Sequence, residues 1–295
     1  MLAPGPLTPQ RQRNLDALRD ELGKRGWIEG RNIAFEYHHA NENPERLPEI
    51  ANALVKKDVN VFVAFGGSST ISALQKATRS LPIVMVAAFE PVEAGYVDSL
   101  ARPGGNITGT TVEFLALAEK RLEILKEIVP NLARVAVLYN RLGPEELGRL
   151  TKAAAGLKVQ LMMRTAGSAK AIESAIAGFK RDNADALLVL PDSEVLERNL
   201  RVVTTLAAQH RLPAIYPWRT YIDLADGLMS YGPNLPSLNR RAAYFVDRIL
   251  KGTKAGDLPV ELPKEFELVV NLKPARALGL AISQRLQLQA NEVIQ

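Results

Sequence analysis

Five residues, Gly66-Gly67-Ser68-Ser69-Thr70, have the types and the spacing to bind an anionic group. They follow the apolar run VFVAF and precede a helical pattern, so they lie where a buried strand ends and a helix begins. The first backbone N–H groups of a helix have no partner within it, and glycine lets a ligand approach them closely. The helix dipole also favours negative charge at this end, so a carboxylate is the ligand group that we expect. A simple helix cap explains the same five residues equally well.

The same corner lacks the pattern of two well-known catalytic loops. A nucleophile elbow requires glycine at the position of Thr70, and a phosphate-binding loop requires a Gly-Lys pair that is absent here. The adjacent His38 and His39 lie in a polar stretch with no further metal-ligand residue at a suitable spacing. We therefore expect no catalytic residue, no metal and no cofactor.

Side chains suited to ligand binding also follow the other predicted strands. Aromatic rings supply flat apolar walls, while carboxylates and amides can hold an amine or a hydroxyl group. Two of these residues have simpler alternatives, because Asp192 with Ser193 can cap a helix beginning at Glu194, and Tyr216 can belong to the core. Taken together, the set favours a binding site. The candidate ligand-binding residues are Ser68, Ser69, Thr70, Phe89, Glu90, Tyr139, Asn140, Asp192, Tyr216 and Tyr231.

The elements that position these residues follow a strand–helix–strand rhythm, which is typical of a parallel sheet covered by helices. The order occurs twice. NIAFEY, a helix through Leu54, VNVFVAFGG, a helix and LPIVMV correspond to VQLMMR, a helix through Phe179, ADALLVLPD, a helix and LPAIYP. The sequence therefore predicts an α/β fold with two Rossmann-like lobes of the same architecture.

The two copies differ at their beginnings. The strand RVAVLYN opens the second copy, whereas only MLAPGPL precedes the first helix of the first copy. In a sheet of order 2-1-3-4-5 the first strand lies between two neighbours, so its loss leaves both of them unpaired. We therefore expect that one strand is missing, that Met1 is an internal start, and that a further strand and a leader lie upstream.

The last part of the chain breaks the repeat. DGLMSYGPN predicts a strand that leaves the second lobe, and the Pro-rich DLPVELPKE leads back to a strand and a helix in FELVVNLKPARALGL. Repeated crossings predict a hinge, with a cleft at the carboxyl ends of the strands of both lobes. The expected lobes are residues 1–110 with 233–260, and residues 111–232 with 261–295.

Composition limits the classes of function. The chain has 295 residues, 47% of them apolar and 23% charged, and its apolar runs are too short to cross a bilayer. The net charge of +5 arises from Lys and Arg that are interleaved with acids, so we expect no nucleic-acid partner. The absence of cysteine excludes disulfides and thiolate metal sites.

Several segments of the sequence resemble a known family. EKRLEILKEIVPNLARVAVLYN, SLARPGGNITG and FELVVNLKPARALGL are similar to ABC-transporter substrate-binding proteins of the kind that includes tryptophan-binding importers. The resemblance extends over nearly the whole chain from about Arg11. It implies a periplasmic-binding-protein type I fold, two lobes that clamp a small molecule, delivery to an ABC permease in the inner membrane, and no catalysis. It also implies a monomer that is periplasmic or anchored outside the cytoplasm.

The resemblance extends to individual positions. Ser68, Ser69 and Thr70 match the loop that meets a ligand carboxylate, and Asn140, Asp192 and Tyr231 match positions that face the cleft. Phe89-Glu90-Pro91 departs from the pattern, because relatives have a small residue, Asp and Pro there. The ligand that these residues imply is an amino acid or an aromatic acid.

Two other functions remain open. The same fold serves as the ligand-sensing module of transcriptional regulators or signalling systems, and an upstream DNA-binding segment would favour that function. An enzyme on two α/β lobes would need a general base beside a nucleophile or a metal, and turnover of a bound compound would favour it.

Overall fold

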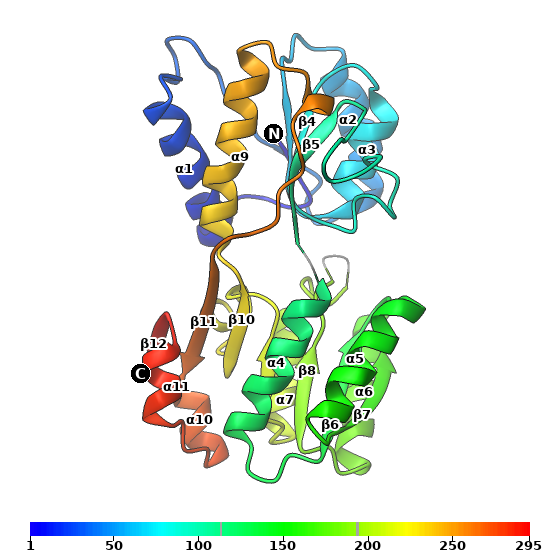
Figure 1. The fold of residues 1–295 in the computed structure, drawn as a ribbon, viewed down its shortest axis with the longest axis vertical. Coiled ribbons are helices and arrows are strands. Elements are labelled where there is room, and N and C mark those ends of the chain that lie inside the picture. The colour runs from blue at the N-terminus through cyan, green and yellow to red at the C-terminus, as the bar shows by residue number, and fades with distance from the viewer. Residues whose placement is uncertain (113, 193–194) are drawn as a thin grey trace. The chain divides into compact units, whose positions relative to one another are not determined.

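A computed structural model of the chain describes residues 1–112, 114–192 and 195–295. The chain divides into two compact units, and each has its own parallel sheet and its own core. Unit 1 comprises Met1–Glu113 and Pro233–Glu265, and unit 2 comprises Phe114–Gly232 and Phe266–Gln295. The chain therefore passes from one unit to the other three times, as Figure 1 shows by its colour.

Unit 1 has a five-stranded sheet of order β2-β1-β3-β4-β5, in which the neighbouring strands are parallel. Helices α1 and α9 pack against each other, and α9 also packs on β4 and β5, while α2 packs on α3 (Figure 1). The elements are β1 (Leu2–Ala3), α1 (Pro9–Lys24), β2 (His38–His39), η1 (Pro44–Arg46), α2 (Leu47–Val55), β3 (Phe62–Ala64), α3 (Ser68–Ala77), β4 (Ile83–Phe89), β5 (Ile107–Val112), α9 (Leu235–Leu250) and η2 (Ala255–Asp257).

The expectation that unit 1 lacks its first strand is wrong. Leu2 and Ala3 form β1, and both are fully buried between the two flanking strands. Leu2 is opposite His38 on one side and Ala64 on the other, and its carbonyl accepts a hydrogen bond of 3.0 Å from the N–H of Phe65. A strand of two residues is enough to complete the sheet here, because β3 is only three residues long and has few backbone groups to pair.

Unit 2 repeats this topology and extends it. Its seven strands have the order β12-β11-β10-β9-β8-β6-β7, so β6 lies next to the edge strand β7, as β1 lies next to the edge strand β2 in unit 1. The elements are α4 (Phe114–Ile128), β6 (Arg134–Tyr139), α5 (Pro144–Gly156), β7 (Gln160–Thr165), α6 (Ala169–Arg181), β8 (Ala186–Val189), α7 (Leu200–Gln209), β9 (Ala214–Tyr216), α8 (Thr220–Asp223), β10 (Met229–Pro233), β11 (Phe266–Asn271), α10 (Leu272–Leu278), α11 (Gln284–Gln289) and β12 (Glu292–Ile294). The predicted α/β fold with two parallel sheets is confirmed.

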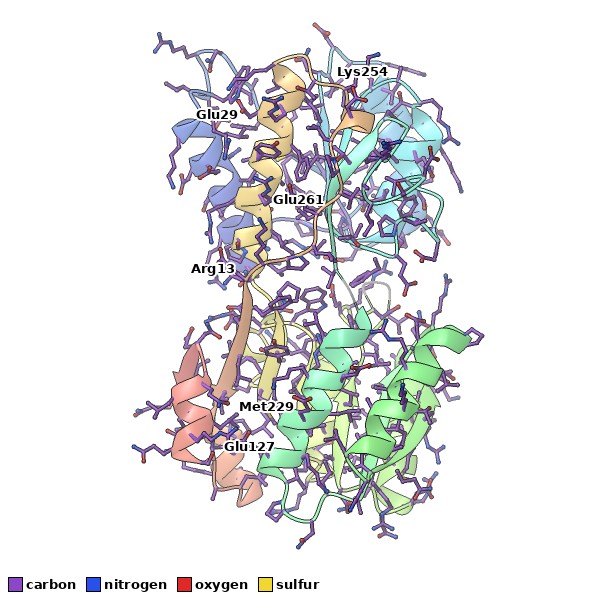
Figure 2. The ribbon with its side chains drawn as sticks, viewed as in Figure 1. Arg13, Glu29, Glu127, Met229, Lys254 and Glu261 are labelled. Carbon is purple, nitrogen blue, oxygen red and sulfur yellow. The ribbon has the colours of Figure 1, made fainter. Side chains whose placement is uncertain are left out.

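Apolar periodicity explains the packing within each unit. Leu15, Leu18 and Leu22 recur at helical spacing and are buried on one face of α1, whose N-terminus is capped by the hydroxyl of Thr8. In unit 2, α4 and α5 cover the sheet face that carries Met229, which is fully buried (Figure 2). The strand predicted at NIAFEY, residues 32–37, is not found there, because pairing with β1 begins only at His38 and β2 comprises His38–His39.

Candidate functional site

The Gly66–Thr70 corner lies where the sequence predicts it, between β3 and α3 of unit 1. Gly66 and Gly67 have φ angles of +77° and +86°, which residues with a side chain rarely adopt. A Cβ atom on Gly66 would also lie 2.4 Å from Cδ of Pro4, which follows the neighbouring strand β1. The two glycines therefore let the chain turn sharply from the strand into the first turn of α3.

The first turn of α3 exposes polar groups that the helix itself does not satisfy. Its N-cap residue is Gly67, so no side chain caps the helix, and the N–H groups of its first turn have no intrahelical acceptor. Ser68 and Ser69 are half-buried, whereas Thr70 is fully buried. The Thr70 hydroxyl has no hydrogen-bond partner among the residues that the structure describes. This arrangement suits an anionic group with several acceptor oxygens.

A buried tyrosine fixes the position of this turn. Tyr96 is 7% exposed, and its hydroxyl donates to the carbonyl of Ser68 at 3.0 Å and lies 2.9 Å from Oγ of Ser72. Tyr96 belongs to the loop after β4, so the loop and the start of α3 are held together. No sequence pattern indicates this role, because Tyr96 stands outside the strand ends.

Phe89 and Glu90 lie at the carboxyl end of β4, as predicted. Phe89 is the half-buried last residue of the strand, and Glu90 is exposed with a φ of +42°. Ala87 also has a positive φ, +55°, where the pairing with β5 is irregular and its N–H donates to the hydroxyl of Thr110 at 3.0 Å. Such backbone conformations are uncommon in residues other than glycine and cluster at functional sites.

In unit 2, Asn140 and Asp192 meet at the ends of the adjacent strands β6 and β8. The amide of Asn140 donates to Oδ2 of Asp192 at 2.9 Å. Oδ1 of Asp192 accepts from the N–H groups of Val195 and Leu196, at 2.5 and 3.1 Å. Asp192 thus caps the turn that precedes α7, as the capping alternative predicts. Ser193 and Glu194, also named in that alternative, lie outside the described residues.

The three tyrosines predicted for the site differ in burial. Tyr139 is the last residue of β6 and Tyr231 lies in β10, and both are half-buried. Tyr216 is 1% exposed, and its ring stacks on that of Tyr221 at 4.7 Å between centroids. Burial raises the pKa of the Tyr216 phenol. The position of Tyr216 agrees with the alternative that it belongs to the core.

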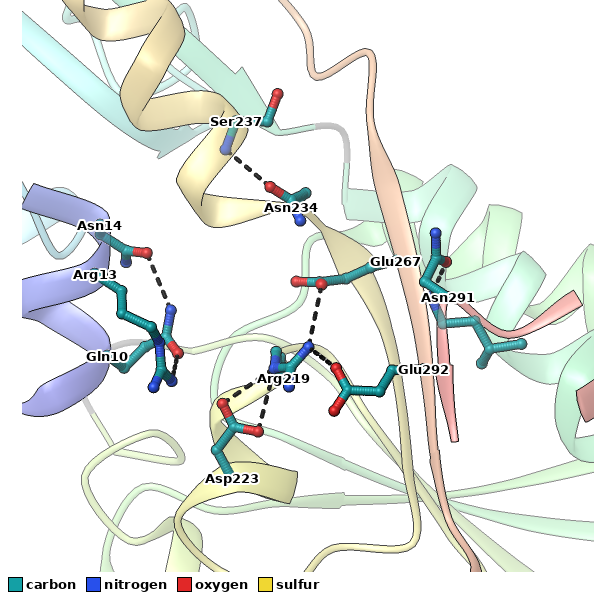
Figure 3. A network of polar contacts seen from close by, with 11 residues as sticks. Gln10, Arg13, Asn14, Arg219, Asp223, Asn234, Ser237, Glu267, Asn291 and Glu292 are labelled. Carbon is teal, nitrogen blue, oxygen red and sulfur yellow. Dashed lines mark hydrogen bonds and ion pairs between the residues drawn. The ribbon is translucent and has the colours of Figure 1, made fainter. Parts of the chain in front are cut away.

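Sequence reasoning missed a charge network around Arg219, just after β9 (Figure 3). Nε of Arg219 lies 3.1 Å from a carboxylate oxygen of Asp223, and Nη1 lies 2.6 Å from Glu292 and 3.9 Å from Glu267. The hydrogen bond to Glu292, with that to Asp223, raises the pKa of Arg219. The network joins β11 and β12 to the end of β9, so no local pattern could indicate it.

Arg121 is the second residue that sequence reasoning missed. It lies on α4 and is 1% exposed, and its Nε donates to the carbonyl of Tyr231 at 2.7 Å. Its Nη1 has no hydrogen-bond partner within the described part of the chain. A signal was available, because residue 121 falls on the apolar stripe of Ala118, Leu122 and Leu125. Among the described residues, no group of three His, Cys, Asp or Glu side chains could hold a metal ion.

The two parallel-sheet units define a protein of the α/β class. The family model described as "ABC transporter substrate binding protein" matches residues 8–294. The chain belongs to this family, and the resemblance seen in the sequence is confirmed. It is a solute-binding protein and not an enzyme.

Several relatives support the assignment. A tyrosine-binding protein of Clostridioides difficile (strain R20291) is 26% identical over 265 residues, which cover 88% of this chain and 74% of the relative. A conserved domain protein of Vibrio cholerae O1 biovar eltor is 28% identical, with a TM-score of 0.86 and coverage of 99% of this chain and 98% of the other. The ABC domain from Streptococcus pneumonia, solved with L-Trp, has the same fold, with a TM-score of 0.87, 21% identity and the same coverage.

The family also bears on where the protein acts. Substrate-binding proteins of ABC transporters act outside the cytoplasm, in the periplasm or at the cell surface. Within the described ranges, no helix combines the length and the apolar composition that a membrane span requires.

Proposed function

We propose that this chain is the substrate-binding component of an ABC importer and that it takes a small carboxylate-bearing molecule, an amino acid or an aromatic acid. The observation that carries the proposal is the first turn of α3 with the unpartnered, fully buried hydroxyl of Thr70. Leaving a buried hydroxyl without a partner costs about 1–3 kcal/mol. A ligand oxygen at this corner would remove that cost.

The first turn of α3 also favours a negatively charged group on the ligand. The N-terminus of a helix carries a partial positive charge, and the N–H groups after Gly67 have no intrahelical acceptor. A carboxylate offers two acceptor oxygens and a full negative charge, whereas a sugar hydroxyl offers neither. The names of two relatives, a tyrosine-binding protein and a structure with L-Trp, support an amino acid with an aromatic group.

We also propose roles for the other predicted residues that do not belong to the core. Phe89, Tyr139 and Tyr231, on β4, β6 and β10, provide apolar walls, while Glu90 and the Asn140–Asp192 pair provide polar contacts. Glu90 and Phe89 distinguish this chain from the family pattern, so we propose that they set its ligand preference. We also propose a monomer, periplasmic or membrane-anchored, that delivers its ligand to a permease.

The double variant S69A/T70V tests the anchor. Valine keeps the shape of threonine without the hydroxyl, so the fold is preserved and stability does not fall. We expect affinity for a carboxylate ligand to fall about tenfold or more, which corresponds to one lost charge-assisted hydrogen bond of about 1.5–3 kcal/mol. S80A, at an exposed serine just beyond α3, is the matched control. Calorimetric titration of all three proteins gives the answer, and unchanged affinity in S69A/T70V contradicts this anchor.

A further inference from the structure

The sheet of unit 1 reverses its winding between β1 and β3. In the order β2-β1-β3-β4-β5, α1 connects β1 to the strand on one side, whereas α3 connects β3 to the strand on the other side. In open parallel sheets, ligands bind at the carboxyl ends of the strands at such a reversal. Two loops therefore border this position, residues 4–8 ahead of α1 and the Gly66–Thr70 corner ahead of α3.

An ion pair lies at the end of β1, beside this corner. Nη1 of Arg11, in the first turn of α1, is 2.6 Å from Oε1 of Glu42 in the loop after β2. A Cβ atom on Gly5 would overlap both of these atoms. A Cβ atom on Gly66 would overlap the ring of Pro4, the residue before Gly5. The ion pair and the corner thus contact consecutive residues of one loop, and all of them belong to unit 1.

Both side chains of the pair can be reached from solvent. The side chain of Arg11 is 32% exposed and that of Glu42 is 42% exposed. Towards the described residues Arg11 uses only Nη1, which donates to Glu42 and to the carbonyl of Pro6 at 3.0 Å, and the Glu42 carboxylate uses only Oε1. Nη2 of Arg11 and Oε2 of Glu42 therefore remain available to a bound molecule.

The backbone and the helix dipole both oppose the placement of this pair. Asn41 and Glu42 have φ angles of +53° and +59°, which are uncommon in residues other than glycine. The dipole of α1 disfavours a cation such as Arg11 in its first turn, and no acid in that turn offsets the charge. An exposed ion pair contributes little to stability, so stability alone does not explain why the chain brings these two charges together here.

The two charges match those of an α-amino acid. Its carboxylate and its ammonium group are attached to one carbon atom, so a site that binds both needs a cation and an anion side by side, next to the groups that bind the carboxylate. We propose that Arg11 shares the ligand carboxylate with the first turn of α3 and that Glu42 accepts the ligand ammonium group. The ligand class is then an α-amino acid and not an acid without an amino group. This inference rests on the proposed function and narrows it.

Amino acids and their deamino analogues test the inference in the full chain. The pairs are L-tyrosine with 3-(4-hydroxyphenyl)propionate, L-tryptophan with indole-3-propionate, L-phenylalanine with 3-phenylpropionate, and L-leucine with 4-methylpentanoate. Each analogue keeps the carboxylate and the side chain and loses only the ammonium group. In calorimetric titration we expect the wild-type chain to bind at least one amino acid about tenfold or more tightly than its analogue. If no amino acid is preferred over its analogue, the inference is overturned.

Variants of the pair locate the preference. E42Q should remove most of it, whereas E45Q, which removes an exposed carboxylate from η1, should leave it unchanged. R11M should weaken binding of the deamino analogue about tenfold, and R46M, at an exposed arginine of η1, should not. If E42Q weakens both members of a probe pair equally, Glu42 is structural and the inference fails. It also fails if E90Q removes the preference and E42Q does not.

The outcomes separate this inference from the proposed function. Deamino analogues that bind the wild-type chain and lose affinity in S69A/T70V support the proposed function whatever E42Q does. Tyramine keeps the ring and the ammonium group of L-tyrosine but has no carboxylate. A wild-type chain that binds tyramine as tightly as L-tyrosine contradicts the proposed function itself.

Discussion

Tyr96→Phe removes one hydroxyl and should weaken both the fold of unit 1 and ligand binding. The hydroxyl makes two hydrogen bonds, at 3.0 Å to the carbonyl of Ser68 and at 2.9 Å to Oγ of Ser72. A neutral hydrogen bond contributes about 1 kcal/mol net, so the free energy of unfolding should fall by about 2 kcal/mol. For a domain of this size the corresponding decrease in Tm is about 4–8 °C. The ring itself stays, so no cavity forms.

The expected loss of ligand binding follows from the position of the Tyr96 hydroxyl beside the first turn of α3. The carbonyl of Ser68 belongs to the turn whose N–H groups we assign to the ligand carboxylate, so a less ordered turn should bind it several-fold more weakly. Ser72→Ala is the matched control, because it removes only the bond to Ser72 and should cost about half as much stability. Differential scanning calorimetry and ligand titration measure the two effects. If Y96F equals the wild-type chain in Tm and affinity, or if S72A has the larger effect, the reasoning is refuted.

Two further predictions concern charged side chains that form ion pairs. Hydrogen bonds from Lys251 and Trp27 lower the pKa of Asp247 although burial opposes them, so Asp247 stabilises the fold above its unfolded pKa and loses this effect as pH falls through the folded value. D247N should cost about 1–2 kcal/mol at pH 7 and much less near pH 3, and a pH-independent difference contradicts this. R219M should speed hydrogen exchange of the β12 amides, since Glu292 loses its partner; unchanged exchange excludes a role in holding β12.

Periodicity and turn chemistry predicted most of the fold. Apolar runs followed by glycine or polar residues marked the strands, and the repeated order of elements indicated two parallel sheets. The error at β1 has a physical reason: a two-residue strand has no period, and only its pairing with β2 and β3 identifies it. The strand is therefore identified by its buried position between β2 and β3, and not by its length.

The candidate site was predictable where strand ends determine it. The Gly66–Thr70 corner could be placed because its glycines mark a turn from strand to helix, and the structure shows that turn. The roles of Tyr96 and Arg121 could not be predicted in this way, because they depend on hydrogen bonds to residues far away in the sequence. Charge on an apolar helical stripe was the available signal for Arg121.

The central claim, that the protein binds a small carboxylate-bearing molecule, is tested most directly by the change in Tm with defined ligands. Purified wild-type chain is scanned with amino acids, aromatic acids, dicarboxylates, sugars and nucleosides, each with the matching amides of the acids. A ligand at about 100 times its Kd adds about 2.7 kcal/mol to stability, which is a clear rise in Tm. We expect acids to raise Tm and their amides to raise it much less. A rise with a sugar or a nucleoside alone would contradict it.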